Sequence, residues 1–404
     1  MASQVLRRHV DSPTLDKQIQ AQWIEPGDIF SLLLLVGGDV VQRAIAQQAG
    51  DPHLPTPVVF SFGWVAYAFL SLLSAVGDNL LMPSLPDLSC VVISTELGYV
   101  RTNQSWVLGR ILRDFELSWM TQDARDGLAA LLNRRKRPKA SLCISVWEPR
   151  LGARPKVPKR DWVWWSGYVV LLVQLSLAAV AWGVWGDWPI FTITLGGSVL
   201  AFITASLPQW RRERWACRSE TKKSFVICRG NGAQHALVIY GNGSGLDLED
   251  LASTGEGSST EPYTRFTMAA LTAAWIVLLI AVIGAKHQTW FLVGIGAIGM
   301  MHTVFVAGKS RSPSAFGIHL SYREYILGDN VMASLKQTEE KYPGIGRSLK
   351  AVFFPGDLKN QEEVDFWEEM KRTEKERKSA IEGLQVPQTH APQTALSLQV
   401  ETKN

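Results

Sequence analysis

Hydrophobic and polar positions are strongly segregated along this chain. Apolar runs of about 20 residues alternate with stretches rich in Arg and Lys, and a helix of that length can cross the hydrocarbon of a bilayer. The pattern therefore predicts six membrane spans as three helical hairpins. These spans cover residues 29–46, 57–77, 162–184, 189–207, 266–285 and 289–307.

The basic residues predict the orientation of these spans. Of the 41 Lys and Arg residues, only Arg43 and Lys286 fall within a span or in the short connections at 48–56, 185–188 and 286–288. Cytosolic loops carry an excess of Lys and Arg, so we expect these connections on the outer face and both termini in the cytosol. The polar N-terminal stretch shows no cleavable signal peptide, and we expect the first span to act as an internal anchor.

The long polar segments between the spans have patterns of their own. β-Branched and aromatic residues at 90–94, 142–147 and 224–240 predict strands, the last as a hairpin around an Asn-Gly turn. An amphipathic repeat at 106–120 predicts a helix.

The fold class that follows is an α-helical polytopic membrane protein with a small mixed α/β cytosolic domain built from the inner loops. The expected organisation is a cytosolic N-terminus (1–25), transmembrane hairpin 1 (26–77), the first segment of the cytosolic loop domain (78–161), hairpin 2 (162–207), the second segment of the loop domain (208–265), hairpin 3 (266–307), a cytosolic tail with helices (308–384) and a disordered end (385–404).

Tryptophan is frequent near the ends of the predicted spans. The indole ring favours the membrane interface, where its ring lies in the apolar zone and its N–H stays hydrated. We therefore expect interfacial belts of indoles. They are Trp162, Trp164, Trp165, Trp182, Trp185, Trp188, Trp210, Trp215 and Trp290.

Polar residues line one face of each of the first two predicted spans. They are Asp28, Ser31, Asp39, Gln42 and Arg43 on the first span, and Trp64, Tyr67, Ser71, Ser74 and Asp78 on the second. A charge near the centre of a span costs at least about 3 kcal/mol, so we expect both faces to point into the bundle. This predicts a polar cavity in which Asp39 or Asp78 acts as a catalytic proton donor. The alternative is a structural ion pair between Asp39 and Arg43, which lie four residues apart.

The remaining motifs predict neither a metal nor a cofactor. The four cysteines, expected as reduced cytosolic thiols, lack metal-ligand spacing. They are Cys90, Cys143, Cys217 and Cys228. The formal G-x-G-x-x-G from Gly294 to Gly299 lies inside a span and favours close helix packing over a dinucleotide site. The acids from Asp247 onward favour helix capping over phosphate binding. The net charge of +4 is explained by orientation and anionic lipid, so we expect the bilayer and no nucleic acid as a partner.

Several stretches together carry a resemblance. They are QWIEPGDIFSLLLLVGGDVVQRAIAQ (22–47), TPVVFSFGWVAYAFLSLLSAVGDNLLMP (56–83), RDWVWWSGYVV (160–170), SLPQWRRERWACR (206–218) and RGNGAQHALVIYGNGSGLDLEDLA (229–252). With them the chain resembles a family of polytopic integral membrane proteins of filamentous fungi, some of whose genes lie in specialised-metabolite clusters. The resemblance implies a multi-pass fungal membrane protein and brings no known reaction with it.

Three functions are compatible with these patterns. The first is an enzyme or enzyme partner acting on a lipophilic metabolite, such as a terpenoid or prenylated compound, with Asp39 as the acid. The alternative is a non-catalytic membrane scaffold or sensor that recruits a cytosolic protein. The third is a transporter, although no inverted repeat with broken helices is visible in the sequence.

Overall fold

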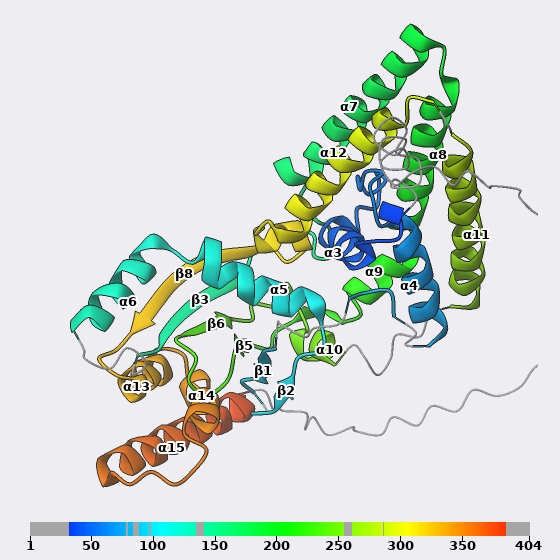
Figure 1. Ribbon diagram of the computed structural model, residues 1–404. Coiled ribbons are helices and arrows are strands. Elements are labelled where there is room, and N and C mark those ends of the chain that lie inside the picture. The colour runs from blue at the N-terminus through cyan, green and yellow to red at the C-terminus, as the bar shows by residue number, and fades with distance from the viewer. Residues whose placement is uncertain are drawn as a thin grey trace, which may run out of the picture.

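Four long apolar helices form a bundle at one end of the computed structural model (Figure 1). They are α7 (Trp162–Trp185), α8 (Trp188–Ala205), α11 (Pro262–Gly284) and α12 (Thr289–Gly308). Each is long and apolar enough to cross a membrane, and large apolar side chains such as Leu172 and Val277 are exposed on their outer faces. A helix of a soluble protein is polar on that face, so these outer faces are suited to lipid.

The structure describes residues 32–77, 80–83, 89–96, 98–134, 141–253, 261–285 and 287–384. The expected cytosolic N-terminus at 1–25 and the expected disordered end at 385–404 lie outside these residues. Within them, the indoles of Trp162, Trp185 and Trp188 are more than half exposed at the ends of α7 and α8. Their positions agree with the expected interfacial belts.

A six-stranded mixed sheet forms the centre of a second region, the sheet domain, which lies at one end of the bundle (Figure 1). In spatial order its strands are β2 (Val100–Thr102), β1 (Val91–Ser94), β5 (Phe225–Cys228), β6 (His235–Ile239), β3 (Cys143–Pro149) and β8 (Leu320–Leu327). β3 pairs with β6 in parallel, and the other neighbours are antiparallel. A separate ribbon joins β4 (Ser219–Thr221) to β7 (Gly245–Leu246). The strands expected at 90–94 and 142–147 and the β5–β6 hairpin are confirmed.

Helices cover both faces of the sheet. One face packs against α5 (Trp106–Asp114), the π-helical turn η1 (Phe115–Trp119) and α6 (Gln122–Arg134), and the other against α13 (Val331–Lys341), α14 (Ile345–Phe353) and α15 (Gln361–Leu384). Along β5, Phe225 and Ile227 join the core on the α5 side, whereas Val226 and Cys228 join the core on the α14 side. Both faces are buried, and this explains why β5 is apolar at every position. The shorter elements are α9 (Pro208–Arg214), α10 (Leu248–Ala252) and η3 (Pro313–Phe316).

The strands of this one sheet come from separate segments of chain, with bundle helices inserted between them. β3 precedes α7, β5 and β6 follow α8, and β8 follows α12. The tail at 308–384 was expected to contain helices, and the strand β8 within it was not predicted. A single apolar core runs from the bundle to the α5 face of the sheet, and bundle and sheet domain therefore pack as one body.

The first two predicted spans are half-length helices in the structure. α3 (Gly38–Gln48) has 11 residues and α4 (Trp64–Val76) has 13, fewer than the roughly 20 that a full span needs. Their first turns lie against each other, because a Cβ added to Gly38 would be 2.7 Å from the backbone N of Tyr67. Of the six spans expected, four therefore appear as full-length apolar helices.

The expected outer turn at 48–56 lies at the sheet-domain end of the bundle instead. There Asp51 accepts two hydrogen bonds from Arg160, the shorter at 2.5 Å, just before α7 begins. Tyr168 also donates its hydroxyl to the carbonyl of Pro55 at 2.8 Å. The reason is the length of α3. This helix begins inside the bundle and is too short to reach the far end, so it ends at the sheet-domain end, and the turn at 48–56 lies there too.

Candidate functional site

The structure places Asp39 and Arg43 on the outside of α3. Both side chains are exposed, and no ion pair joins these two described residues. The apolar positions of α3, such as Val41, occupy the inward face, because packing them against the bundle buries apolar surface. Gln42 is half-buried and donates to the carbonyl of Leu81 at 2.8 Å. The expected inward orientation of Asp39 and the expected Asp39–Arg43 pair are therefore both wrong.

The polar face of α4 does turn inward, as predicted. Tyr67 and Ser71 are completely buried, and Ser74 is half-buried. The ring of Trp64 stacks on that of Trp275 in α11, with the ring centroids 5.1 Å apart. Asp78, the second candidate acid, lies outside the described residues.

Residues 57–60 form an extended segment that fills the interior between α7 and α12. Gln174 donates its amide to the carbonyl of Phe60 at 2.7 Å, near the middle of α7. A Cβ added at Gly167 or Gly299 would lie 2.0 Å from the carbonyl oxygen of Pro57 or Phe60, respectively, so only glycine fits there. Buried backbone at this depth needs hydrogen-bond partners from the protein, and Gln174 supplies one. Main chain thus fills the interior between α7 and α12, whereas the polar cavity was expected between the first two predicted spans.

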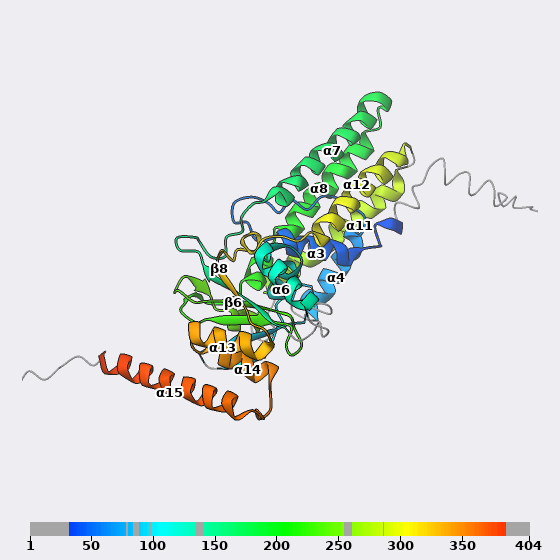
Figure 2. The same ribbon diagram turned by 90° about the vertical axis from the view of Figure 1, so that its left-hand side faces the viewer.

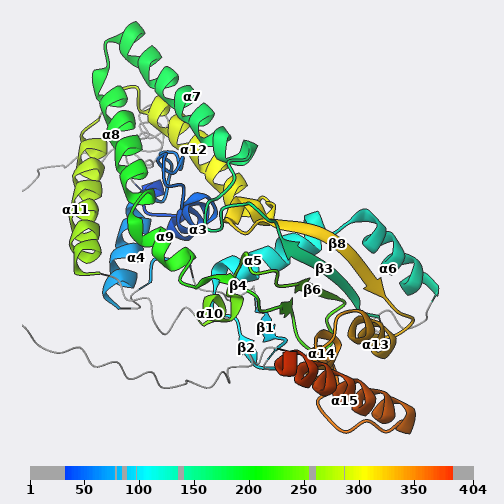
Figure 3. The same ribbon diagram turned by 180° about the vertical axis from the view of Figure 1, so that it is seen from behind.

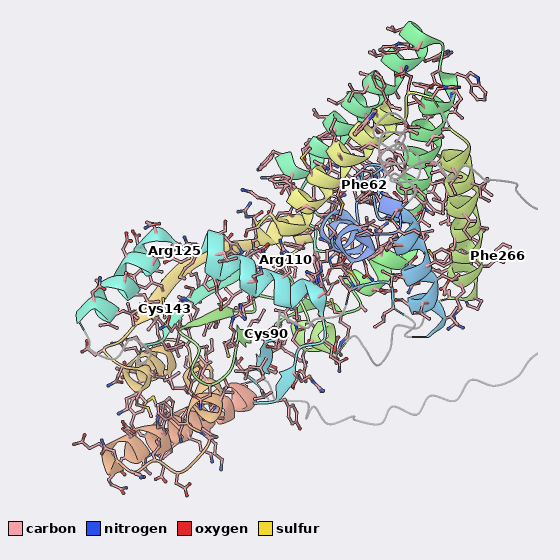
Figure 4. All side chains as sticks on the ribbon, viewed as in Figure 1. Phe62, Cys90, Arg110, Arg125, Cys143 and Phe266 are labelled. Atoms are coloured by element: carbon pink, nitrogen blue, oxygen red, sulfur yellow. The ribbon has the colours of Figure 1, made fainter. Side chains whose placement is uncertain are left out.

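Buried arginines join the bundle to the sheet domain. Arg110 of α5, labelled in Figure 4, donates to three carbonyls at the end of α12, those of Ala307 at 2.9 Å, Gly308 at 3.2 Å and Lys309 at 2.8 Å. Its Nε also lies 3.1 Å from a carboxylate oxygen of Asp114. The last carbonyls of a helix lack partners within the helix and carry the negative end of its dipole. Arg110 therefore caps α12 from the sheet domain.

Arg311 links four elements at the same place. Its guanidinium makes two hydrogen bonds to Asp161, at 2.7 and 2.8 Å, and one to the carbonyl of Gln47 at 2.5 Å. Its backbone N–H donates to Asp114 at 2.9 Å. Asp161 is also the N-cap of α7, where it accepts the N–H of Trp164. The ends of α3 and α12, the start of α7, and α5 are thus held together.

Arg214 completes this arginine junction, which consists of Arg110, Arg214 and Arg311. The Arg214 side chain is fully buried, and it donates to the carbonyl of Ala46 at 3.0 Å. The guanidinium lies 5.4 Å from the ring of Trp215 and 5.2 Å from that of Phe316. Trp215 is itself buried, as is Trp210. The assignment of these two indoles to an interfacial belt was therefore wrong, as was that of Trp164, which is 2% exposed.

Burial opposes the charges at the junction. It lowers the pKa of Arg110 to about 10, although the carboxylate of Asp114 acts in the opposite direction. It likewise raises the pKa of Asp114, against the effect of Arg110. The two groups therefore compensate each other's burial, and loss of one charge would leave the other buried without compensation.

The sequence interpretation missed this junction because it treated the basic residues only as orientation signals. A signal is present, since Asp161, Arg214 and Arg311 each lie within a few residues of a predicted span end. Arg211 and Arg212 lie equally close to a span end and are exposed. Proximity to a span end alone therefore cannot tell an inward arginine from an outward one.

The helices α14 and α15 lie at the end of the sheet domain away from the bundle (Figures 1 and 2). A groove of about 570 Å³ lies between them. Its charged lining residues are Arg347, Lys350, Asp357, Glu368 and Lys371. Trp367, which also lines it, is 5% exposed, and its Nε1 has no hydrogen-bond partner within the described residues. The volume lies in the range of protein sites that accept a small ligand or a few side chains.

The β5–β6 hairpin is a structural unit with its charges paired. Gly230 and Gly232 have φ of 93° and 86°, the left-handed conformation that this turn requires. Arg229 donates to both carboxylate oxygens of Glu116, the shortest contact being 2.8 Å. Asp247 caps α10 by accepting two backbone N–H groups, as predicted. A phosphate would meet acids rather than free cations here.

Neither the metal-binding side chains nor the comparisons with known proteins assign a function to the chain. Across the residues that the structure describes, no group of three His, Cys, Asp or Glu side chains could hold a metal ion. The four cysteines are free thiols. No protein-family model, curated protein or solved structure matches the chain.

Proposed function

We propose that the protein is a membrane-anchored docking protein. The bundle anchors it in the bilayer, the sheet domain stands at the cytosolic surface, and the α14–α15 groove receives a segment of a partner protein. The observation that carries this proposal is the arginine junction, which fixes the sheet domain to the bundle. It supports the scaffold alternative over the enzyme.

The arginine junction costs desolvation free energy, which a flexible linker between the two regions would not. Burying a guanidinium is expensive even with good hydrogen bonds, and a buried ion pair is weak support for stability alone. What the junction does provide is a defined orientation, because Arg110, Arg214 and Arg311 contact the ends of α3 and α12 directly or through η3. A fixed orientation is useful to a protein that presents a surface to a partner.

The orientation across the membrane belongs to the same proposal. Basic residues flank the candidate spans at the sheet-domain end, and Lys159, Arg160, Arg211 and Arg212 are among them. The excess of Lys and Arg in cytosolic segments supports a cytosolic sheet domain and cytosolic termini. α3 and α4 would then enter the membrane without crossing it, which leaves four spans in place of six.

The enzyme hypothesis has less support from the geometry. It needs an acid in a polar cavity, and the side chain of Asp39 is exposed on α3. Its remaining acid, Asp78, lies outside the described residues. A lipophilic terpenoid or prenylated substrate and a fungal source stay hypotheses that follow from the sequence resemblance.

Site-specific photocrosslinking in cells tests the docking proposal. A benzophenone side chain placed at Glu368, inside the groove, should give a discrete protein adduct, and one placed at the exposed Glu362 outside it should not. Lys371→Glu should reduce the Glu368 adduct, whereas the neighbouring Arg372→Glu, which does not line the groove, should leave it intact. Equal adducts at both positions, or none at Glu368, would refute a partner in the groove.

One observation favours a second candidate, a channel or transporter. α3 and α4 are half-length helices whose first turns meet inside the bundle, and transporters often build their sites from discontinuous helices of this kind. Liposomes containing the protein would show solute or ion flux if this were the function. Absence of flux at verified protein incorporation would dismiss it.

A further inference from the structure

The exposed face of α9 forms a basic pocket at the end of α8. α9 turns Arg214 inward to the junction and leaves Arg211 and Arg212 exposed. With Lys156 and Trp215 these two arginines line a cavity of about 320 Å³ (Figure 3 shows α9 between α8 and the sheet domain). The pocket therefore lies where the candidate span ends, which is the depth of lipid headgroups.

Two of the three cations are held in place by the protein. Lys156 has a positive φ of 64°, and its Nζ donates to the carbonyl of Cys217 at 2.5 Å. Arg212 is paired with Glu261, and both side chains are about half exposed. Arg211 is exposed and makes no ion pair within the described residues. The pocket thus holds a positive charge that no carboxylate of the described chain neutralises.

The remaining wall of the pocket is rigid and apolar. The ring of Trp215 is fixed by a hydrogen bond from its Nε1 to the carbonyl of Phe316 at 3.0 Å. It packs so closely that a Cβ on Gly50 or Gly317 would lie within 3.0 Å of it. A fixed aromatic wall beside fixed cations is a preformed site, which loses little entropy on binding.

We propose that this pocket, lined by Lys156, Arg211, Arg212 and Trp215, binds the phosphate of an anionic phospholipid headgroup. Arg and Lys suit phosphate oxygens as charge-assisted donors. A free phosphate ion shares this chemistry, but the position at the end of α8 favours a headgroup whose acyl chains lie along the bundle. The site needs only the bilayer, so it does not depend on the docking proposal.

Native mass spectrometry of the full chain, released from nanodiscs of defined composition, tests the site. Nanodiscs of phosphatidylcholine with phosphatidic acid should yield protein that retains phosphatidic acid, and phosphatidylcholine alone should leave no retained lipid. Each cation near the surface contributes about 1 kcal/mol to anionic lipid binding, so Lys156→Gln with Arg211→Gln should lower retention about thirtyfold. Arg211→Gln alone should lower it about fivefold and cannot disturb the Lys156 contact.

Matched controls decide between the outcomes. Lys222→Gln with Arg372→Gln removes the same charge from exposed positions of the sheet domain and should leave retention unchanged. Equal retention in the pocket variants and this control would overturn the proposal. Inorganic phosphate should not displace the lipid, and displacement by phosphate would overturn the lipid as the ligand.

Discussion

The substitution Asp161→Asn isolates the charge of the arginine junction from the rest of its structure. Asp161 both caps α7 and pairs with Arg311, whose side chain is 1% exposed. Asn is as good an N-cap as Asp, so the cap should survive. What is lost is the negative charge that compensates a buried guanidinium.

The size of the effect follows from the exposure of the two partners. Breaking a buried ion pair costs about 3–5 kcal/mol, and one hydrogen bond to a charged group is worth about 1.5–3 kcal/mol. The Asp161 side chain is 24% exposed, so water can reach it, and Asn keeps one acceptor oxygen for Arg311. We therefore expect a loss of about 2–3 kcal/mol at the junction.

Hydrogen–deuterium exchange in nanodiscs measures this loss locally. The N–H of Arg311 is bonded to Asp114, so its protection reports opening of the junction. Its exchange should accelerate about 30- to 140-fold, because each 1.4 kcal/mol is about a tenfold change in the opening equilibrium. Unchanged exchange there would refute the reasoning.

Two further variants separate the charge from the cap. Asp187→Asn makes the same change at the N-cap position of α8, where the side chain makes no capping bond, and should have no effect. Asp161→Asn combined with Arg311→Met also removes the uncompensated cation and should recover some of the protection. If the double variant is worse than Asp161→Asn, the ion pair is not the cause.

Three other changes give equally direct tests. Gly299→Ala should destabilise the bundle by about 1–3 kcal/mol in thermal unfolding, because its Cβ would lie 2.0 Å from the carbonyl of Phe60, whereas Gly294→Ala in the same helix meets nothing within 4 Å and should be neutral. Asp39→Asn should change stability by less than about 0.5 kcal/mol and leave metabolite profiles unaltered, since the side chain is exposed, and loss of a metabolite at normal protein abundance would restore the enzyme hypothesis. Burial lowers the pKa of His235 below its usual 6.5, so the unfolded chain takes up a proton first as the pH falls through 6.5. Stability should therefore decrease from about pH 7 to about pH 5 by unfolding measurements, and less steeply in His235→Gln.

Local patterns predicted the sheet domain better than the membrane-facing segments near the N-terminus. The β5–β6 hairpin follows from an Asn-Gly turn between apolar runs, and the α10 cap follows from Asp247. Both depend on residues close in sequence. β8 was missed because its pattern is mixed, with Arg323 and Glu324 on an edge strand that only its pairing with β3 explains.

The first two predicted spans show why hydropathy alone misleads. Residues 57–63 are apolar enough for a span, but Pro57 disfavours a helix through this segment and the left-handed Gly63 is the N-cap at which α4 begins. The burial of this extended backbone depends on Gln174, more than 100 residues away. Asp39 was misplaced for a related reason, since a full-length span would have forced it inward and a half-length helix does not.

The connectivity makes the sheet domain dependent on the bundle. The parallel pairing of β3 with β6 requires the chain to pass through α7 and α8, and β8 reaches β3 only after α11 and α12. The arginine junction then closes around helix ends that exist only in the assembled bundle. We therefore expect residues 89–161, expressed alone, to remain unfolded, with little protection from hydrogen exchange. A stably folded fragment would contradict this reasoning, because it would show that β1, β2 and β3 with their helices need neither the bundle nor the strands that follow it.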